Sequence, residues 1–341
     1  MPPQQRPAGR DETLAPARSR VSGTSVGMFA TVFLIWLLSL VVVALPAYGV
    51  AVLGGWPRVT VAVLACAAWT ASAALILVRP VEAALARLLY RDLRRPRAAE
   101  MARITPALER VCRRAGTDPS RYLLRVEEKR QVNAFALGGH VLAVTRVACE
   151  LPDDMLEAVL AHEVGHHRHL HPVAIILGWW YLLPFEVGDR LLRAIRRITR
   201  WLARSFGRLN ERTGGVAGGR APEGALGMLV LLVLLAVLVV AGTVLVVVLG
   251  VVWLPLALLV RLAKVLSAAL SRAGELAADR HAAELGYGPA LIQVLGLFLQ
   301  VERSVPRPRG MAALLRSHPP SQSRIDEINK TLHLRASTIY R

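Results

Sequence analysis

Long uncharged apolar segments constrain the fold of this chain more than any other feature. Met28–Leu53, Val59–Val78 and Ala225–Val260 contain no charged residue. Each of the first two is long enough to cross a bilayer core of about 30 Å as a helix, and the first is too long for the apolar part of a signal peptide. The sequence therefore predicts two retained transmembrane helices within residues 28–79 and further crossing in residues 225–262.

The charged residues gather beside these segments. The 341 residues include 42 Lys+Arg and 24 Asp+Glu, a net charge of +18, and 54% are hydrophobic. Arginines precede the first span and follow the second, namely Arg6, Arg10, Arg18, Arg20, Arg79, Arg87, Arg91, Arg94, Arg95 and Arg97. By the positive-inside rule both flanks are cytoplasmic. We expect a lipid bilayer as partner and no nucleic acid, because no recognition module accompanies the charge.

The cysteine and lysine content constrains the fold and the function only weakly. Only 3 cysteines occur, so no disulfide framework is implied and a reducing compartment fits. Arginine greatly exceeds lysine, which is typical of a GC-rich bacterial genome.

Two middle segments have alternative interpretations. Val173–Phe185 is apolar but short, and Trp179, Trp180 and Tyr181 resemble an interfacial aromatic belt, so it dips into the membrane or crosses it. Asp189–Leu209 predicts a basic amphipathic helix on an anionic membrane surface, or else a helix packed on the soluble domain.

The longest apolar segment is also ambiguous. As one straight helix, Ala225–Val260 would measure about 54 Å and overshoot a bilayer. It is either a hairpin of two spans that breaks near Gly242 or one tilted span continued by an interfacial helix. The arginines of residues 173–224 favour the hairpin and four spans in all. Both solutions return residue 270 to the cytoplasmic side.

The rest of the sequence predicts a mostly α-helical soluble domain with a small β-sheet, in two parts, residues 80–172 and 263–334. Val81–Gly116 has helical spacing interrupted near Pro96. Residues 122–126, 133–137 and 140–145 are short β-prone stretches, and a helix begins at Pro152 and ends by Pro172. Residues 1–27 read as a disordered cytoplasmic tail and residues 335–341 as a C-terminal tail.

One short motif carries chemistry. His162, Glu163 and His166 lie in the run Ala-His-Glu-Val-Gly-His-His on the helix after Pro152. Histidines four residues apart share one helix face and converge on one metal ion, while the glutamate reaches a metal-bound water. The motif predicts a hydrolase with one Zn²⁺ per chain.

A site with two histidines needs a third protein ligand. The segment Ser271–Asp279 offers Glu275 and Asp279, one helical turn apart. We expect Glu275 to complete the site and Asp279 to orient a ligand histidine through its second ring nitrogen. The alternative for Glu275 is a solvated carboxylate beside Arg272.

Four segments in order along the chain carry a family resemblance. They are Asn133-Ala134-Phe135-Ala136, the motif from His162 to His166, Glu275 with Asp279, and Ser317-His318-Pro319-Pro320 followed by Arg324 and Ile325. With these segments the chain resembles the HtpX-type integral-membrane zinc metallopeptidases, which are related to the CAAX prenyl endopeptidases. Gly274 and Leu276 depart from the family, which often has arginine and an aromatic residue there.

The resemblance implies a zincin-like catalytic domain joined to transmembrane helices. It places Asn133, Ala134, Phe135 and Ala136 on a strand beside the cleft that pairs with an extended peptide, whereas alone Phe135 is a core aromatic and Asn133 a turn residue. It also implies that His318 and Arg324 hold the substrate carbonyl or oxyanion, or that His318 approaches the metal at rest. The alternative is capping of a helix over 321–334.

Four further histidines surround the motif, namely His140, His167, His169 and His171. We expect them to be solvated or to act as helix caps, and we do not expect a second metal site.

Together these features predict a membrane-embedded zinc metalloendopeptidase with Glu163 as general base and a cytoplasmic catalytic domain. The resemblance implies polypeptide substrates, notably misfolded membrane proteins of a bacterial plasma membrane, and a homo-oligomer is compatible with it. The alternatives are a specific processing protease and an idle zinc-binding scaffold. Glu163 speaks against the scaffold, because a structural zinc site needs no base.

Overall fold

The structure is a computed structural model that describes residues 23–212, 225–304 and 318–339. These residues form two compact units, which we describe one at a time. The helical unit comprises residues 29–75 and 175–268, and the mixed unit comprises residues 76–174 and 269–339 together with 23–28. Most of the predicted cytoplasmic tail, residues 1–22, lies outside the described residues, whereas residues 23–27 already belong to the first helix.

Two antiparallel helices begin the helical unit. Helix α1 spans Gly23–Gly54 and α2 spans Arg58–Ile76, and the chain reverses at Gly55, whose φ of 68° suits glycine. Both helices are long and apolar enough to cross a membrane, as is Trp253–Glu284. A fourth crossing is available if α5 and α6, which are bent by 61°, count as one span. The two transmembrane helices expected within residues 28–79 are therefore confirmed by length and composition, whereas the candidate span Trp253–Glu284 overlaps the expected segment 225–262 only in part.

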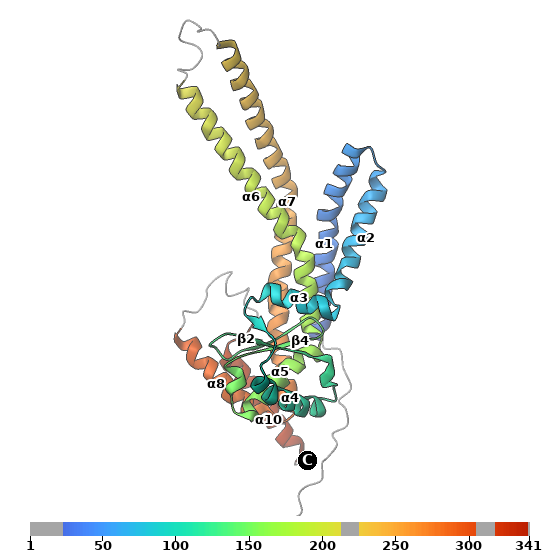
Figure 1. The fold of residues 1–341 in the computed structure, drawn as a ribbon, viewed down its shortest axis with the longest axis vertical. Helices are drawn as coiled ribbons and strands as arrows, with labels where there is room; N and C mark the ends of the chain where they lie inside the picture. Colours follow the sequence, from blue (N-terminus) through green and yellow to red (C-terminus); the bar gives the residue numbers. More distant parts are fainter. Residues whose placement is uncertain (1–22, 213–224, 305–317, 340–341) are drawn as a thin grey trace, which may run out of the picture. The chain divides into compact units, whose positions relative to one another are not determined.

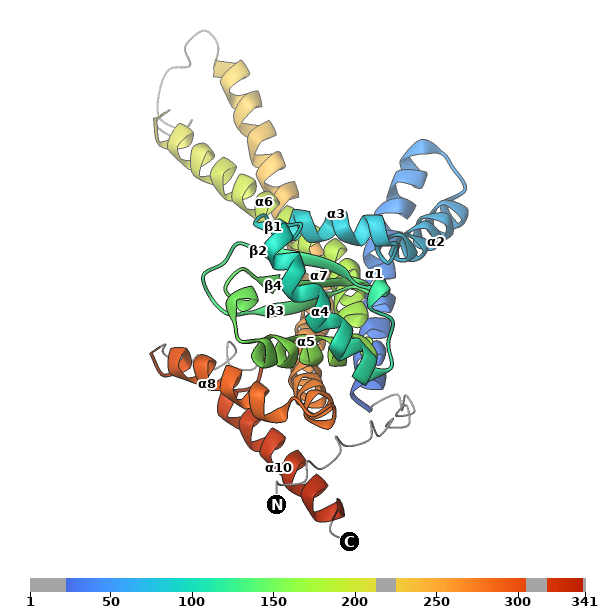
Figure 2. The same ribbon diagram turned by 60° about the horizontal axis from the view of Figure 1, so that its bottom comes forward.

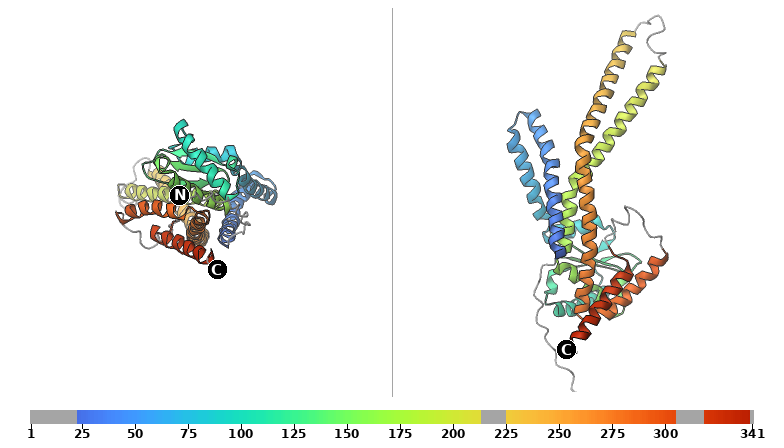
Figure 3. Two further views of the ribbon diagram at one scale, coloured as in Figure 1. Left: turned by 90° about the horizontal axis from the view of Figure 1, so that it is seen from below. Right: turned by 180° about the vertical axis from the view of Figure 1, so that it is seen from behind.

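Two longer helices complete the helical unit. Helix α6 spans His171–Arg212 and α7 spans Ala225–Glu284, and the two run side by side in opposite directions (Figures 1 and 3). The hairpin expected near Gly242 is wrong, because α7 is continuous there. A glycine inside a helix costs only about 1 kcal/mol, which does not force a break. The short segment and the basic helix expected as separate elements are likewise one helix.

Aromatic side chains join the four helices of this unit. The Trp69 and Trp180 rings stack 5.5 Å apart, and Trp180 donates to the Ser72 hydroxyl at 3.0 Å. Tyr181 is 7% exposed beside Ala263. Trp180 and Tyr181 therefore pack between helices of this unit, and the interfacial belt expected from them stays a prediction.

The mixed unit contains a four-stranded sheet with the order β1-β2-β4-β3 (Figure 2). The strands are β1 at Leu93–Arg94, β2 at Leu123–Glu127, β3 at Ala134–Leu137 and β4 at Val141–Thr145. β2 is parallel to β4, and β3 is antiparallel to it. The predicted small sheet is thus confirmed, although β1 was not expected. β4 is central and wholly buried, and β3 is an edge strand.

Two helices cover the sheet and form the core with it. Helix α4 spans Ala98–Ala115 and α5 spans Asp153–Arg168, and they pack on each other around Ile104, Leu156 and Leu160. α4 begins where Glu100 accepts from the Arg97 N–H at 2.7 Å. Asp153 and Asp154 lie in the first turn of α5, where carboxylates stabilise the positive end of a helix.

The helix that follows α2 fixes one end of the sheet. Helix α3 spans Arg79–Leu89, and its fully buried Glu82 accepts from the backbone N–H groups of Gly139 at 2.6 Å and His140 at 3.1 Å. Gly138 has a φ of 59°, and a β-carbon there would clash with the Glu82 carboxylate. A buried carboxylate therefore clamps the turn between β3 and β4.

The chain ends in two helices that pack together, α8 at Gly288–Ser304 and α10 at Ser321–Ile339 (Figure 3). Ser321 begins α10, where the Glu302 carboxylate accepts its N–H at 3.2 Å and its hydroxyl at 3.0 Å. The predicted tail at 335–341 is wrong as far as Ile339, because the helix continues to that residue.

Candidate metal centre

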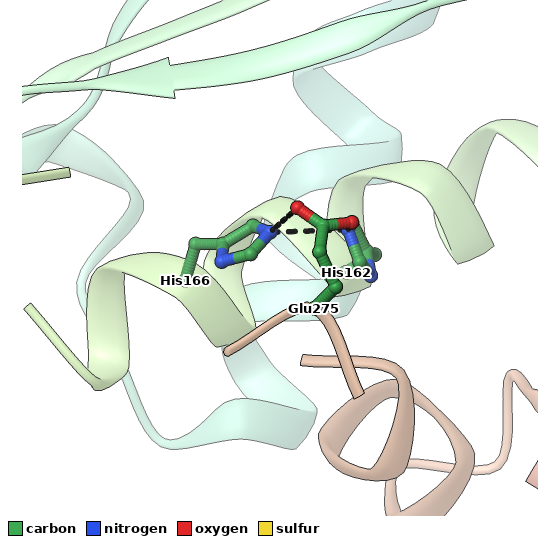
Figure 4. Close-up of side chains that lie close together, drawn as sticks. All are labelled: His162, His166 and Glu275. Carbon is green, nitrogen blue, oxygen red and sulfur yellow. Dashed lines mark hydrogen bonds and ion pairs between the residues drawn. The ribbon is translucent and has the colours of Figure 1, made fainter. Parts of the chain in front are cut away.

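Helix α5 carries the histidine motif on its buried face. His162 and Glu163 are 6% and 5% exposed, and the Nε2 atoms of His162 and His166 lie 3.2 Å apart. The two imidazoles lie on successive turns of one helix and face one point (Figure 4).

A second helix approaches α5 closely at the motif. A β-carbon on Gly165 would lie 3.1 Å from the Cα of Ala278 and 3.2 Å from its carbonyl oxygen. Glycine between the two histidines thus lets α7 lie directly against α5. This contact brings Glu275, one turn before Ala278, to the histidines.

The donor atoms of His162, His166 and Glu275 fit one metal ion. Neighbouring ligand atoms in a tetrahedral zinc site with bonds of about 2.0–2.1 Å are separated by about 3.3 Å. His166 Nε2 lies 3.3 Å from Glu275 Oε1, and His162 Nε2 lies 3.6 Å from Glu275 Oε2. The two histidine nitrogens lie 3.2 Å apart, and with one ligand atom taken from each residue the three atoms all lie within 4.8 Å of one another, so the carboxylate faces both imidazoles around one point. Two imidazoles and a carboxylate are also donors that zinc accepts.

A buried ion pair lies behind His162. Asp279 is fully buried, and its Oδ1 lies 2.9 Å from His162 Nδ1. Arg324, from α10, donates to both Asp279 oxygens at 2.7 Å each. Burial alone would lower the pKa of Arg324, but the hydrogen bonds and charge of Asp279 raise it above its ordinary value. The pair therefore stays charged, and Asp279 is held where it can accept the Nδ1–H of His162.

His318 lies at the open side of the centre. Its side chain is 66% exposed, and its Nδ1 lies 3.1 Å from Glu275 Oε1. The hydrogen bond that the His318 ring donates to the Glu275 carboxylate raises the pKa of His318. His318 thus reaches the same carboxylate as His162 and His166 but remains accessible from solvent.

Comparison with known proteins agrees with this centre. A family model described as Peptidase family M48 matches residues 98–209 and 220–332, which is more than half of the chain. The chain belongs to peptidase family M48. The resemblance found in the sequence is confirmed, and the matched ranges include both histidines of the motif, Glu275, Asp279 and Arg324.

One curated relative supports a narrower similarity. A protein of Aeropyrum pernix named "Protease HtpX homolog" is 40% identical over 99 residues, which are 27% of this chain and 30% of that protein. The alignment thus spans less than a third of the relative's length.

In this M48 chain the structure places Asn133–Ala136 at the edge of the sheet. Asn133 exchanges hydrogen bonds with Thr145, and β3 begins at Ala134. The Phe135 ring stacks on Tyr90 at 4.4 Å. Helix α5 packs against β3, so the edge strand runs beside the helix that carries the motif.

The further histidines differ from the expectation. His167 is 4% exposed and packs edge-on against Tyr122, and His171 is 2% exposed. His140 Nδ1 lies 2.9 Å from Glu82. The expectation of solvated or capping residues is wrong for His167 and His171, because the sheet and α7 cover the end of α5. Sequence spacing gives no signal for this burial, since it depends on contacts between distant segments.

Proposed function

We propose that this chain is a membrane-embedded zinc metalloendopeptidase. The observation that carries the proposal is the convergence of His162, His166 and Glu275, whose ligand atoms lie within 4.8 Å of one another, with Glu163 next to His162 on α5. A structural zinc site has four protein ligands and needs no base, whereas three ligands leave a position for water and substrate. Membership of a peptidase family supports the same reaction.

The chain's own residues divide the reaction between them. When bound, zinc polarises the scissile carbonyl and makes water more acidic. Glu163 takes the proton of the attacking water and passes it to the leaving amine nitrogen, so no covalent enzyme intermediate is needed. Asp279 fixes the ring of His162, and Arg324 fixes Asp279. His318, the exposed member of the group, holds the developing oxyanion.

Substrate binding uses the edge strand in this proposal. Among the described residues, β3 pairs only with β4, which leaves its other side for an extended peptide. Strand addition uses mainly hydrogen bonds to the peptide backbone, so peptides of many sequences can bind. The binding strand consists of Asn133, Ala134, Phe135 and Ala136, and we therefore expect a broad preference for unfolded polypeptides.

The physiological role and location are a further part of the proposal. Apolar helices able to cross a bilayer indicate a membrane protein, and the arginines that follow α2 support a cytoplasmic mixed unit. Misfolded proteins of a bacterial plasma membrane are then accessible substrates, and their degradation would be a quality-control function. A homo-oligomer is compatible with this arrangement.

The basic part of α6 supports contact with anionic lipid. Its exposed arginines are Arg190, Arg193, Arg196, Arg197, Arg200, Arg204 and Arg208. Arg193 pairs with Asp189, whereas Arg200 and Arg204 donate to carbonyls of their own helix. Placing an arginine at the centre of a bilayer costs about 2.5–3.5 kcal/mol, so we expect this face to contact lipid phosphates at the membrane surface.

Vesicle binding tests this contact. The full chain should prefer vesicles with phosphatidylglycerol over phosphatidylcholine vesicles, and glutamine at Arg197, Arg200 and Arg204 should remove the preference. An equal distribution of wild type between the two would contradict this.

The main experiment uses Glu163→Gln, with Glu150→Gln as a control at a surface carboxylate that is 59% exposed. Purified Glu163→Gln should keep one zinc per chain and cleave casein at least about 100-fold more slowly than wild type. The control should match wild type. Glu163→Gln cleaving at the wild-type rate would rule out its role as base.

The same assay separates the alternatives. Wild type that binds zinc but cleaves no polypeptide would be a scaffold. Wild type that ignores casein but cleaves one protein trapped by Glu163→Gln would be a specific processing protease.

A further inference from the structure

The second nitrogen of His166 has an unexpected neighbour. His166 Nε2 faces His162 and Glu275, and its Nδ1 lies 3.3 Å from Nδ1 of His171. A histidine that binds a metal through one nitrogen normally donates its other N–H to an acceptor, which fixes the tautomer and the ring orientation. For His162 that acceptor is Asp279.

We propose that His171 is a positioning residue of the metal centre, accepting the Nδ1–H of His166 so that Nε2 of His166 faces the metal. The inference rests on the zinc site proposed above. It assigns the two ligand histidines different supports. His162 is supported by a carboxylate held by Arg324, and His166 by an imidazole.

The turn between α5 and α6 places His171 for this contact. Leu170 has a φ of 56°, and among the described residues no other non-glycine residue has a positive φ. The left-handed conformation costs a leucine roughly 1–2 kcal/mol. At this turn the chain bends by 61° between the helices, and His171 begins α6 five residues after His166. A strained turn is thus maintained where it brings the two rings together.

Gly274 makes room for the ring. A β-carbon on Gly274 would lie 2.7 Å from Cε1 and 2.8 Å from Nδ1 of His171. Any other residue at 274 would displace the His171 ring or α7, and Gly274 directly precedes the ligand Glu275. The glycine that departs from the family pattern is therefore explained by the ring that it accommodates.

Packing alone does not explain a histidine at this position. His171 is 2% exposed, and its Nε2 is buried with no hydrogen-bond partner among the described residues. A buried polar atom without a partner costs about 1–3 kcal/mol, so an apolar side chain of similar size would pack better. The hydrogen bond between the Nδ1 atoms of His166 and His171 explains why an imidazole occupies position 171.

The test measures metal binding directly, with Zn²⁺ affinity by chelator competition and the visible spectrum of the Co²⁺-loaded full chain. His171→Leu removes the acceptor, and its affinity should fall about 10–100-fold with a changed Co²⁺ spectrum. His171→Asn offers an amide oxygen near the Nδ1 position and should restore affinity to within about threefold. Gly274→Ala, which crowds the ring, should resemble His171→Leu.

The control is His169→Leu. The His169 ring stacks beside His171 at 5.5 Å, at the same turn, and its replacement should leave both readouts unchanged.

Three outcomes decide the inference. His171→Leu with wild-type affinity and spectrum would overturn it. Equal losses of zinc affinity in His171→Leu and His171→Asn, with matching decreases in the melting temperatures of the metal-free proteins, would also overturn it. Such losses would indicate that His171 acts only through packing. Wild type that binds no zinc would instead contradict the proposed function, so the two failures are distinct.

Discussion

Replacement of Arg324 by methionine tests whether the buried carboxylate of Asp279, on α7, depends on the Arg324 guanidinium for its stability. Arg324 is 8% exposed and Asp279 is fully buried, and two N–H groups of Arg324 donate to the two oxygens at 2.7 Å each. Methionine keeps the length of the side chain but removes both bonds, the charge and the ion pair of Arg324 Nη1 with Glu275 Oε2 at 3.3 Å. Asp279 then remains buried with His162 as its neighbour.

The size of the destabilisation follows from the burial of the Arg324–Asp279 pair. Removing one partner of a buried ion pair costs about 3–5 kcal/mol, because the other charge stays buried without compensation. At about 2–4 °C per kcal/mol, the melting temperature of the metal-free protein should fall by about 6–20 °C. Adding Asp279→Leu removes both charges and should recover most of the loss. Zinc affinity of the double variant should still be about 10–100-fold below wild type, since His162 has lost its acceptor.

The assay is thermal unfolding in detergent with a chelator, followed by zinc competition on the same samples. Arg280→Met is the control, because Arg280 is 50% exposed and lies 3.8 Å from Glu327. Exposed pairs contribute about 0–1 kcal/mol, so the control should melt close to wild type. Arg324→Met melting within about 2 °C of wild type would refute the reasoning, as would a double variant less stable than the single one.

Two further predictions concern α5 and α4. Gly165→Ala should weaken zinc binding about tenfold, because its methyl group forces Ala278 away, whereas Gly296→Ala, with nothing within 4 Å, should leave affinity unchanged in the same titration. The hydrogen bond from Arg94 lowers the pKa of Glu100 from 4.5 to about 2, so its contribution is complete above pH 4.5 and is lost as the pH falls toward 2. With Arg94 24% exposed, Glu100→Gln should cost about 1–2 kcal/mol at pH 7. Melting temperatures of the two proteins should converge as the pH falls toward 2, and a difference that stays constant with pH would contradict this.

The elements that the sequence predicts best are those with a local cause. Strands β2, β3 and β4 and helix α5 follow from residue preferences and turn residues within each segment. The motif of α5 identifies two ligands because helix geometry alone puts them on one face. Glu275 could be proposed because a site with two histidines needs a third ligand and the segment Ser271–Asp279 offers a carboxylate, and the family resemblance then supported the choice.

The features that the sequence does not predict depend on contacts between distant segments. The burial of His171 requires Gly274, more than a hundred positions later. The continuity of α6 and α7 is also beyond hydropathy, because both contain a proline, Pro184 and Pro255, that could equally end a helix. Neighbouring helices such as those around Tyr181 make an unbroken helix favourable there.

The clamp at the β3–β4 turn has a consequence for affinity. Glu82 holds one end of the edge strand, and Thr145 holds the other through Asn133. A peptide that adds to such a strand meets a template that is already ordered, so little entropy is lost by the protein on binding. The strand has only 4 residues, however, and each backbone hydrogen bond contributes about 0.5–1.5 kcal/mol net. A peptide bound through β3 alone would therefore dissociate readily, and a long unfolded polypeptide could bind again through another of its segments.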